Sequence, residues 1–565
     1  MSEITVKNLK YKYPGADRLA LDGIDLSVEK GDFIGVIGAN GAGKSTFAEA
    51  LIGLVPQFFN GAYGGMVEIA GMKAETTPVS ELCKKVGLVF QNPFNQLSGA
   101  KNKVFDEVAF GLENMGIAPD EMKERIERVL RKLDMWEYRD RNPFELSGGQ
   151  MQRVAIASIL VMDPDIIILD EPTSELDPEG TEEVFKTVET LSHSGKTIIM
   201  IEQKIEKIAK YCSHLLLLSE GKQIDYDTTA KVLSRPDLED YGVKAPAFTR
   251  LCKALALTEP DGTYPVTLES AKKLISENKE HITAKAPTIA INDVAEDLSH
   301  VIYQVNDLDF YYRSGTDIFK NFNLLLDSRP TAIVGQNGAG KTTLAKLLKG
   351  LLKPCGGNIY FGQDDISKKT VAMLAGKVGY VFQNPDDQIF KYKILDEVMF
   401  GPLNIGMTEE AARKNAIDAL AVVGLSDKKD ENPYDCQLSE RKMISIASVL
   451  AMNTDVLILD EPTIAQDTHG KEVISSIIKD LKGKGKLVIS ILHDMDFVAE
   501  NFDRMIIMAH GHILEDNVPE MAFSNDTALK EARLQKPYTA ELCNELALPY
   551  TYLTVEGAIA CMSKK

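Results

Sequence analysis

The chain contains two copies of one unit, and this duplication constrains its fold more than any other feature. GANGAGKST begins at Gly38, and GQNGAGKTT begins at Gly335, 297 residues later. LDEPT, which surrounds Asp170, returns around Asp460 after 290 residues. Motifs that return at nearly one spacing indicate a repeat of whole domains. A length of 565 residues agrees with this, because single cores rarely exceed about 250 to 300 residues.

The repeat continues beyond these motifs and predicts the domain boundaries. FTRLCKALAL in the first copy matches TAELCNELAL in the second at an offset of 291 residues. We expect one domain at 1–240 with a helical tail and linker at 241–300, and a second domain at 301–520 with a C-terminal helical tail at 521–565. The tail helices either help to hold the two halves together or pack locally, and the sequence leaves both interpretations open.

Composition excludes several classes of protein. The formal net charge is −20, so the surface should repel nucleic acid in general, and no nucleic-acid partner is expected. The longest nearly uninterrupted apolar run, VAIASILVM, has nine residues, whereas a membrane-spanning helix needs about 20. The seven cysteines are scattered without a C-x-x-C pair, which argues against a zinc site, an iron–sulfur cluster or a disulfide framework.

Each copy carries the phosphate-binding pattern G-x-x-x-x-G-K-[ST] directly after an apolar run that reads as a buried strand, FIGVIG in one copy and TAIVG in the other. The glycines allow backbone N–H groups to turn toward phosphate oxygens, and the following helix presents its positive end. Lys44 and Lys341 are placed to reach the β- and γ-phosphates, and Ser45 and Thr342 are placed to ligate Mg²⁺.

A pair of carboxylates follows a second apolar run in each copy. Asp170 and Glu171 end DIIILDE, and Asp460 and Glu461 end DVLILDE. Ligands of open α/β sheets bind at the carboxyl ends of strands, so these side chains are expected beside the phosphates. The aspartate suits Mg²⁺, and the glutamate is placed to polarise an attacking water.

The set of phosphate loop, FQNP, LSGGQ, LDEPT and a downstream switch residue resembles the ATP-binding cassette (ABC) ATPase family, twice and over essentially the whole chain. The resemblance implies an α/β fold with two nucleotide-binding domains, each with a RecA-like P-loop core, an antiparallel β-subdomain, an α-helical subdomain and a small C-terminal helical tail. It also implies that the chain is an ATPase with ATP and Mg²⁺ as cofactors.

The resemblance assigns roles to individual residues. Glu171, Gln203, Glu461 and His493 would be catalytic, and the metal would be held by Ser45, Gln91, Asp170, Thr342, Gln383 and Asp460. ATP binding would involve Tyr13, Gly38, Asn40, Gly41, Gly43, Lys44, Ser45, Thr46, Gln91, Ser147, Gly148, Gly149, Gln150, Asp177, Tyr312, Gly335, Asn337, Gly338, Gly340, Lys341, Thr342, Thr343, Gln383, Ser439 and Asp467. Tyr13 and Tyr312 would stack on adenine; the alternative is an aromatic packed within the β-subdomain.

Two departures from the family pattern concern the switch residue and the signature. His493 follows the strand of the second copy, whereas Gln203 stands at the matching place of the first. LSGGQ at 146–150 becomes LSERK at 438–442. In this family the halves pair head to tail, so Gln203 and LSERK would belong to one composite site, and LSGGQ and His493 to the other.

The LSERK segment has a functional and a structural interpretation. Matching LSERK to LSGGQ places Ser439 at the position of Ser147 and replaces the glycines by Glu440 and Arg441. A carboxylate about 4 Å from a phosphate costs about 4 kcal/mol at an effective dielectric near 20, unless it turns to solvent or pairs with Arg441 or Lys442. Alternatively, Ser followed by Glu is simply a good helix start. We expect the site with LSERK to bind ATP and hydrolyse it slowly.

The segment after each FQNP glutamine narrows the class. FQNPFNQ followed by DEVAFG, and FQNPDDQ followed by DEVMFG, resemble the ATPase components of energy-coupling factor (ECF) importers of vitamins or metal ions. That resemblance implies a transmembrane T component and a substrate-binding S component as partners, and a peripheral location on the cytoplasmic face of the cell membrane. F-N-Q and D-D-Q depart from the D-N-Q common in that group. The alternatives are the twin-cassette ATPase of a sugar importer and a soluble twin cassette that acts on ribosomes or DNA.

Overall fold

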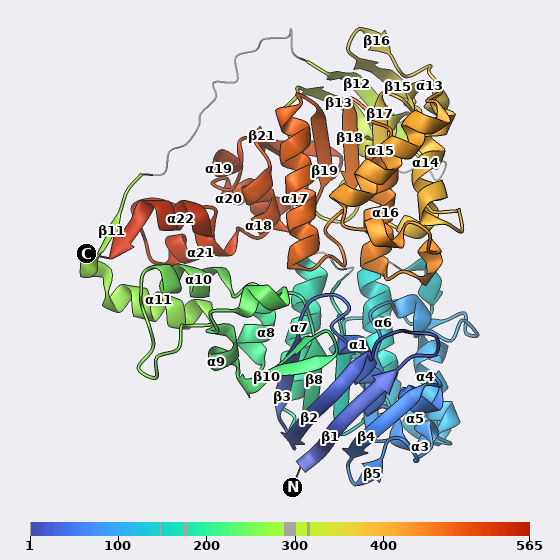
Figure 1. The fold of residues 1–565 in the computed structure, drawn as a ribbon, viewed down its shortest axis with the longest axis vertical. Helices are drawn as coiled ribbons and strands as arrows, with labels where there is room; N and C mark the ends of the chain where they lie inside the picture. The colour runs from blue at the N-terminus through green and yellow to red at the C-terminus, as the bar shows by residue number, and fades with distance from the viewer. Residues whose placement is uncertain are drawn as a thin grey trace. The chain divides into compact units, whose positions relative to one another are not determined.

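The computed structural model of the chain describes residues 2–146, 148–174, 176, 178–286, 301–312 and 317–564. It divides into two compact units, Met1–Thr283 with Ser563–Lys565 and Ala284–Met562. Figure 1 shows that each unit contains its own set of sheets and helices. A short two-stranded sheet of β11 (Ile282–Ala284) and β22 (Met562–Lys564) brings the last residues of the chain into the first unit.

The first unit is built on a six-stranded sheet with the order β10-β9-β3-β8-β7-β6. The pairs from β9 to β6 are parallel, and β10 joins β9 antiparallel. Its strands are β3 (Phe33–Ile37), β6 (Val86–Val89), β7 (Ile166–Asp170), β8 (Thr197–Ile201), β9 (His214–Ser219) and β10 (Lys222–Thr228). All residues of β3, β7 and β8 are buried, which explains their continuous apolar sequences.

The second unit repeats this topology, with the order β17-β18-β19-β14-β20-β21. The parallel strands are β14 (Thr331–Val334), β17 (Val378–Val381), β18 (Val456–Asp460), β19 (Leu487–Ile491) and β20 (Arg504–Ala509), and β21 (His512–Asn517) is antiparallel. The phosphate-loop strand lies inside the sheet in both units, so both of its edges are paired and its carboxyl end is held firmly.

A four-stranded antiparallel sheet accompanies each core sheet. In the first unit the strands are β1 (Ser2–Lys12), β2 (Leu21–Glu29), β4 (Ala62–Ile69) and β5 (Met72–Lys73), with the order β2-β1-β4-β5. In the second unit they are β12 (Tyr303–Tyr311), β13 (Asp317–Leu326), β15 (Gly356–Phe361) and β16 (Asp364–Asp365), with the order β13-β12-β15-β16. In β12 buried and exposed residues largely alternate, because one face of the sheet packs on the core.

Three helices pack against one another in each unit. They are α4 (Val104–Asn114), α5 (Pro119–Lys132) and α6 (Gly148–Leu160) in the first unit, and α14 (Ile394–Asn404), α15 (Glu409–Val422) and α16 (Leu438–Leu450) in the second. Pro119 opens α5 where its missing N–H is harmless, and the Thr408 hydroxyl caps α15 by accepting from the Ala411 N–H. Their apolar faces join the core sheet in one continuous hydrophobic cluster per unit.

The remaining helices cover the core sheets and form the tails. The first unit has α1 (Lys44–Leu51), α2 (Leu54–Gln57), α3 (Val79–Leu82), α7 (Pro178–Ser192), α8 (Ile205–Tyr211), α9 (Thr229–Leu233), α10 (Ala247–Ala254) and α11 (Leu268–Glu277). The second has α12 (Lys341–Lys349), α13 (Val371–Leu374), α17 (Thr468–Gly483), α18 (Met495–Asn501), α19 (Pro519–Ala522), α20 (Asp526–Glu531), α21 (Tyr538–Glu545) and α22 (Val555–Cys561). No helix in the described ranges is long and apolar enough to cross a membrane.

Each tail is fastened to its own unit in the same way. The backbone N–H of Ala247, at the start of α10, donates to a carboxylate oxygen of Glu206 at 3.4 Å. The N–H of Tyr538, at the start of α21, donates to Asp496 at 3.3 Å. Local packing of the tails is therefore present, and a role in holding the halves together stays a prediction.

The predicted fold class is confirmed, with parallel core sheets and antiparallel subdomains in two repeated domains. The chain passes from the first unit to the second between Thr283 and Ala284, and each unit includes its tail helices, so the boundaries expected after residues 240 and 520 stay predictions.

Candidate active sites

The phosphate loops lie between a buried strand and a helix in both units. The first joins β3 to α1, and the second joins β14 to α12. Gly38 and Gly335 open the loops with φ values of 147° and 149°. A Cβ at Gly38 would stand 2.2 Å from the Leu218 carbonyl oxygen, and one at Gly335 would stand 2.1 Å from that of Met508. Only glycine fits these positions, because the neighbouring strand passes too close for any side chain.

The lysine of each loop is buried and lies over its own loop. The Lys44 ammonium donates to the carbonyl oxygens of Gly38 and Ala39 at 2.8 and 2.9 Å. Lys341 donates to Gly335 and Gln336 at 2.6 and 3.0 Å. The other predicted loop residues follow in the loop or the first helical turn: Asn40, Gly41, Gly43, Ser45, Thr46, Asn337, Gly338, Gly340, Thr342 and Thr343. The loops therefore concentrate N–H groups, hydroxyls and one ammonium at the helix N-terminus, an arrangement suited to phosphate.

The acidic residues lie at the carboxyl ends of β7 and β18. Asp170 and Asp460 are the last residues of these strands and are buried, as are the glutamates that follow. Glu171 and Glu461 have φ values of 45° and 50°, a left-handed conformation that costs a non-glycine residue energy. The same unusual backbone conformation therefore occurs directly after the strand in both units.

Each glutamate is held between two side chains from residues that closely follow the ends of neighbouring strands. In the first unit the amide groups of Gln91 and Gln203 donate to the two carboxylate oxygens of Glu171 at 2.8 and 2.9 Å. Gln203 also donates to Asn40 of the phosphate loop at 3.3 Å. The predicted catalytic and loop residues of this unit are thus brought together.

The second unit has the same arrangement with one exchange. Gln383 donates to one carboxylate oxygen of Glu461 at 3.0 Å, and Nε2 of His493 lies 3.1 Å from the other. His493 therefore occupies the position that Gln203 occupies in the first unit. An imidazole can carry a proton and a charge there, and an amide cannot.

The aspartates have different surroundings. In the second unit the Tyr380 hydroxyl donates to Asp460 at 2.7 Å, and the Thr342 hydroxyl lies 3.3 Å from its other oxygen. In the first unit Ser45 bonds to Asp170, and the residue corresponding to Tyr380 is the apolar Leu88. Burial raises the pKa of both aspartates. Serine or threonine hydroxyls and carboxylate oxygens are ligands that Mg²⁺ prefers, so these groups fit such an ion.

The charges around the two glutamates also differ. Burial raises the pKa of Glu171 to about 7; Lys44 opposes the rise, and the carboxylates of Asp170 and Glu202 add to it. Glu202 is itself buried and accepts hydrogen bonds from the Thr173 hydroxyl at 2.6 Å and from the Gln203 N–H at 2.9 Å. The corresponding residue of the second unit is the apolar Leu492.

In the second unit positive groups dominate instead. Burial by itself would raise the pKa of Glu461, but the hydrogen bond and charge of His493, with Lys341 and Lys442, hold it below its ordinary value. Lys442 is 2% exposed and donates to three backbone carbonyl oxygens. Its counterpart in the first unit is the neutral Gln152. One unit thus adds a buried carboxylate to its site and the other adds a buried ammonium.

The predicted adenine-stacking residues lie next to the phosphate-loop helices. The Tyr13 hydroxyl is 3.1 Å from the Thr46 hydroxyl and donates to Glu49 at 2.9 Å. The Tyr312 hydroxyl is 3.2 Å from that of Thr343, and the Tyr312 side chain is 42% exposed. Both rings also make edge contacts with aromatic residues of the strand that precedes them, Tyr11 in β1 and Phe310 in β12. Both tyrosines therefore lie beside the helix that follows the phosphate loop. Stacking on adenine stays a prediction.

The matching of LSERK to LSGGQ is wrong by two residues. Helices α6 and α16 both have 13 residues, and each follows a short 3₁₀ turn, Pro143–Glu145 or Pro433–Asp435, at the same interval. The two glycines of LSGGQ open α6, whereas Leu438 and Ser439 open α16. The residue before the helix is Ser147 in one unit and Gln437 in the other. Ser439 therefore stands at the position of Gly149, inside the helix, and not at that of Ser147.

The charged residues of LSERK are paired differently from the expectation. Glu440, at the position of Gln150, accepts from the Lys428 ammonium at 2.7 Å and from the Gln437 N–H at 3.2 Å. Arg441 forms an ion pair with Asp386 at 3.0 Å, and Lys442 points inward. Glu440 thus helps to start the helix, as the structural interpretation expected, and its charge is balanced by Lys428 and not by Arg441 or Lys442.

Two predicted residues, Ser147 and Asp177, lie outside the described residues. Asp467, the counterpart of Asp177, caps α17 by accepting from the Gly470 N–H at 2.9 Å. Next to it, Gln466 donates to the backbone oxygen of Ser439 at 3.0 Å, so this loop contacts the start of α16.

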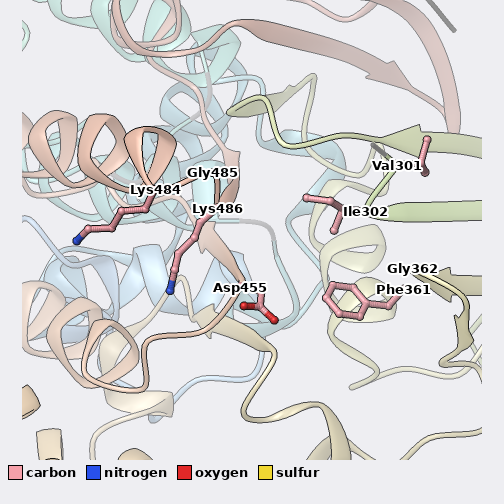
Figure 2. Close-up of a pocket in the computed structure, with 8 residues that line it drawn as sticks. All are labelled: Val301, Ile302, Phe361, Gly362, Asp455, Lys484, Gly485 and Lys486. Carbon is pink, nitrogen blue, oxygen red and sulfur yellow. The ribbon is translucent and has the colours of Figure 1, made fainter. Parts of the chain in front are cut away.

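A hollow of about 400 Å³ lies at the opposite end of the second unit's sheet (Figure 2). Asp455, which lines it, directly precedes β18, whereas Asp460 ends that strand. The ammonium groups of Lys484 and Lys486 already bond to Asp480 and to backbone oxygens of Asn453 and Thr454. Because ligands of such sheets bind at the carboxyl ends of the strands, the hollow is separate from the nucleotide site.

Sequence reasoning missed three polar residues of the sites: Tyr380, Lys442 and Glu202. Tyr380 and Glu202 lie in or beside apolar strand sequences, where the opposite copy has Leu88 and Leu492. A position-by-position comparison of the two copies reveals both differences. Lys442 was hidden by the two-residue error in matching the signatures.

Comparison with known proteins agrees with this geometry. The family description "ABC transporter" matches residues 21–174 and 320–464. The chain belongs to the ABC transporter family. A putative ABC transporter ATP-binding protein of Caldanaerobacter subterraneus subsp. tengcongensis is 36% identical over 100% of this chain and 99% of its own length. One from Methanosarcina acetivorans is 35% identical over 96% of this chain and 90% of its own.

Among solved structures, cbiO1 from Clostridium perfringens, described as part of the ABC transporter complex cbiONQ, is 32% identical to the part it matches. It covers 41% of this chain and 94% of its own, with a TM-score of 0.37. The family establishes that the chain is the ATP-binding subunit of an ABC transporter and an ATPase that hydrolyses ATP for transport.

Proposed function

We propose that this ABC protein powers an ECF-type importer of vitamins or metal ions, with a transmembrane T component and an S component as partners. The observation that carries the proposal is the segment after each FQNP glutamine. Gln96 accepts from the Phe90 N–H at 3.1 Å and donates to the Ala155 carbonyl oxygen at 2.9 Å. Gln388 makes the same bonds to Phe382 and Ser445 at 3.2 and 2.9 Å. The second glutamine of Q-N-P-x-x-Q therefore fastens this loop to the signature helix.

The glutamate of the D-E-V sequence fixes the next part of the loop. Glu107 accepts from the Ser98 N–H and hydroxyl at 2.6 and 2.8 Å, and Glu397 accepts from the N–H groups of Phe390 and Lys391 at 3.0 and 2.9 Å. Both glutamates are buried. The two sequence patterns that mark the ECF resemblance, Q-N-P-x-x-Q and D-E-V, thus have the same structural effect. Both hold a loop in place at the surface.

Aromatic side chains are exposed on this loop and on the helix and 3₁₀ turn near it. In the second unit Phe390, Tyr392, Phe400 and Tyr434 are 49%, 80%, 39% and 43% exposed, and they lie in two ring pairs with centroids 4.6 and 6.2 Å apart. In the first unit Phe94, Phe110 and Phe144 are exposed. Exposed aromatic clusters of this kind suit a protein partner, and an apolar helix of a membrane protein fits them.

A membrane partner is tested by co-purification. We expect the chain, expressed with a candidate T component, to stay bound to membranes at the cytoplasmic face, and Phe390→Ala with Tyr392→Ala to weaken this binding at least tenfold. Met373→Ala, at another exposed apolar residue of the same unit, is the matched control. Co-sedimentation with ribosomes without membrane binding would support a soluble twin cassette that acts on ribosomes. Recruitment only by a sugar permease would support the ATPase of a sugar importer.

We further propose that the two ATP sites are unequal. The site with Lys341, Glu461 and His493 would pair with LSGGQ, and the site with Lys44, Glu171 and Gln203 would pair with the segment that begins at Gln437. In this segment Gln437, Leu438 and Ser439 stand where the other signature has its serine and both glycines. Two side chains of ordinary size then stand where backbone N–H groups must approach a phosphate closely.

In the hydrolytic site Glu461 would orient and polarise the attacking water, while Gln383 and His493 hold its carboxylate in place. Lys341 and the loop N–H groups would bind the phosphates and offset the charge that develops on them. Thr342, Asp460 and Gln383 would hold Mg²⁺, which supplies charge neutralisation of the phosphates. In the other site Gln203 keeps the hydrogen bond to Glu171 and cannot take part in proton transfer, so ATP would be held longer.

The test compares Glu461→Gln with Glu171→Gln in an ATPase assay. We expect Glu461→Gln to remove most of the turnover, by about 100-fold or more, and Glu171→Gln to reduce it less than about threefold. Equal losses would overturn the proposal of unequal sites and leave the transport proposal standing.

A further inference from the structure

We propose that Lys442 is a positioning residue that links the start of the signature helix α16 to the catalytic glutamate of its own unit. It lies in the second turn of α16, 2% exposed, with its side chain directed into the unit. The ammonium donates to the carbonyl oxygens of Phe382, Gln383 and Asp460 at 2.9, 2.6 and 3.2 Å. A lysine ammonium has three N–H donors, so this shell is complete.

The three carbonyl groups belong to the parts of the site that must stay in register. Phe382 and Gln383 follow β17, and the Gln383 side chain donates to Glu461 at 3.0 Å. Asp460 ends β18 and precedes Glu461. Lys442 therefore bonds to the backbone after β17 and to the residue before Glu461, so a shift of α16 would be passed to Gln383 and Glu461 through one side chain.

The first unit shows what the same place looks like without this link. Gln152 corresponds to Lys442 and is also 2% exposed, yet its Nε2 is without a hydrogen-bond partner among the described residues. A neutral side chain therefore fits this space. An ammonium is far more costly to bury than an amide unless all its donors are bonded and opposite charges lie near, as here. The link is thus a specific feature of the unit that carries His493.

The inference is independent of how the two units pair. One consequence rests on the proposed function: with head-to-tail pairing, α16 would contact the nucleotide of the other site. Lys442 would then report the state of one ATP site to the glutamate of the other. This would be one half of a coupling between sites, carried by a packed side chain within a single unit.

The test uses the full chain with Glu171→Gln, so that turnover depends on Glu461. We expect Lys442→Met to lower kcat per bound ATP at least tenfold and to change KM less than twofold, because Lys341 and Tyr312 keep their places. Lys442→Gln, which copies Gln152, should give an intermediate loss. Folding is followed by the melting temperature, and sites are counted with a non-hydrolysable ATP analogue.

The matched control is Lys349→Met. Lys349 is buried in the same unit and donates to the Val378 carbonyl oxygen, away from Glu461. It should lower the melting temperature and leave kcat per bound ATP unchanged. Unchanged kcat in Lys442→Met, or equal loss in both variants, would overturn the proposal. If Lys442→Met does not fold, parental kcat in Lys442→Gln overturns it. These results do not depend on whether Glu171→Gln and Glu461→Gln differ in ATPase activity. Failure of this proposal is therefore distinguishable from failure of the proposal of unequal sites.

Discussion

The Tyr380 hydroxyl donates a hydrogen bond of 2.7 Å to the Asp460 carboxylate, and both residues are buried at the end of the core sheet. The first unit has Leu88 at the corresponding position. Two copies of one fold therefore hold their metal-site aspartates with different means. The second unit adds a hydroxyl and an ammonium around its carboxylates, and the first adds the carboxylate of Glu202.

Tyr380→Phe should lower kcat of the site that uses Glu461. A hydrogen bond to a charged group contributes about 1.5 to 3 kcal/mol, so a loss of about 10- to 100-fold is expected if most of it is expressed in the transition state. The ATP concentration for half-maximal rate should change little, while the Mg²⁺ requirement should rise. Steady-state ATPase assays with varied Mg²⁺ measure both.

Tyr303→Phe is the control for this change. Tyr303 is also buried in the second unit, and its hydroxyl donates to the Leu348 carbonyl oxygen at 3.1 Å. Tyr303→Phe should lower the melting temperature and leave kcat unchanged. Equal effects of the two variants would show that Tyr380 only supports the fold.

His493→Gln should make the second site resemble the first. Glu461 would keep a hydrogen bond, as Glu171 does with Gln203, and would lose the charge that lowers its pKa. We expect total ATPase activity to fall at least tenfold. Gln203→His, the reciprocal change, should leave total activity within about twofold of the parent protein, and a large gain from it alone would contradict the assigned roles of the signatures.

Glu202→Gln should tighten ATP binding to the first unit. The change removes a buried negative charge close to Asp170 and Glu171, keeps an oxygen to accept from the Gln203 N–H, and offers an NH2 group that can donate to the Thr173 hydroxyl. At an effective dielectric near 20, one unit charge at about 10 Å is worth about 1.7 kcal/mol, which corresponds to at most about 20-fold in affinity. Titration with a fluorescent ATP analogue in a Glu171→Gln, Glu461→Gln background measures it. Unchanged affinity would contradict an effect of the Glu202 charge on ATP binding.

The sequence predicted the parts of the site that depend on short motifs and strand ends. The spacing G-x-x-x-x-G-K-[ST] after an apolar strand predicted a loop followed by a helix, and Lys44 and Lys341 begin such helices because loop and helix are local structures. Glu171 and Glu461 directly follow the ends of β7 and β18, as the sequence suggested, and a parallel sheet brings the carboxyl ends of its strands to one edge. Gln91 and Gln383 then met them from 80 and 78 residues away, as the family pattern implied. The roles of these residues toward ATP stay predictions.

The sequence did not predict the signature register or the polar residues behind the site. Because Leu followed by Ser occurs in both copies, the sequence comparison matched Leu438 and Ser439 to Leu146 and Ser147. The helix start depends instead on the 3₁₀ turn that precedes it. Lys442 bonds to residues 18, 59 and 60 positions away, so its contacts follow from the packing of a helix on a sheet and not from any local pattern.

Restoring the signature of the second copy provides the strongest test of unequal sites. In a Glu461→Gln background only the site with Glu171 can turn over. Gln437→Ser, Leu438→Gly and Ser439→Gly together return a hydroxyl before α16 and two residues without side chains in its first turn. Each glycine costs about 1 kcal/mol of helix stability at most, so a folded protein is expected. Adding Gln203→His completes the site, and residual ATPase activity should rise at least fivefold over the Glu461→Gln parent. Lys428→Ala, which only releases the partner of Glu440, should give no such gain. Failure of the restored protein to exceed its parent, although it binds ATP equally well, would mean that neither the signature nor Gln203 limits this site.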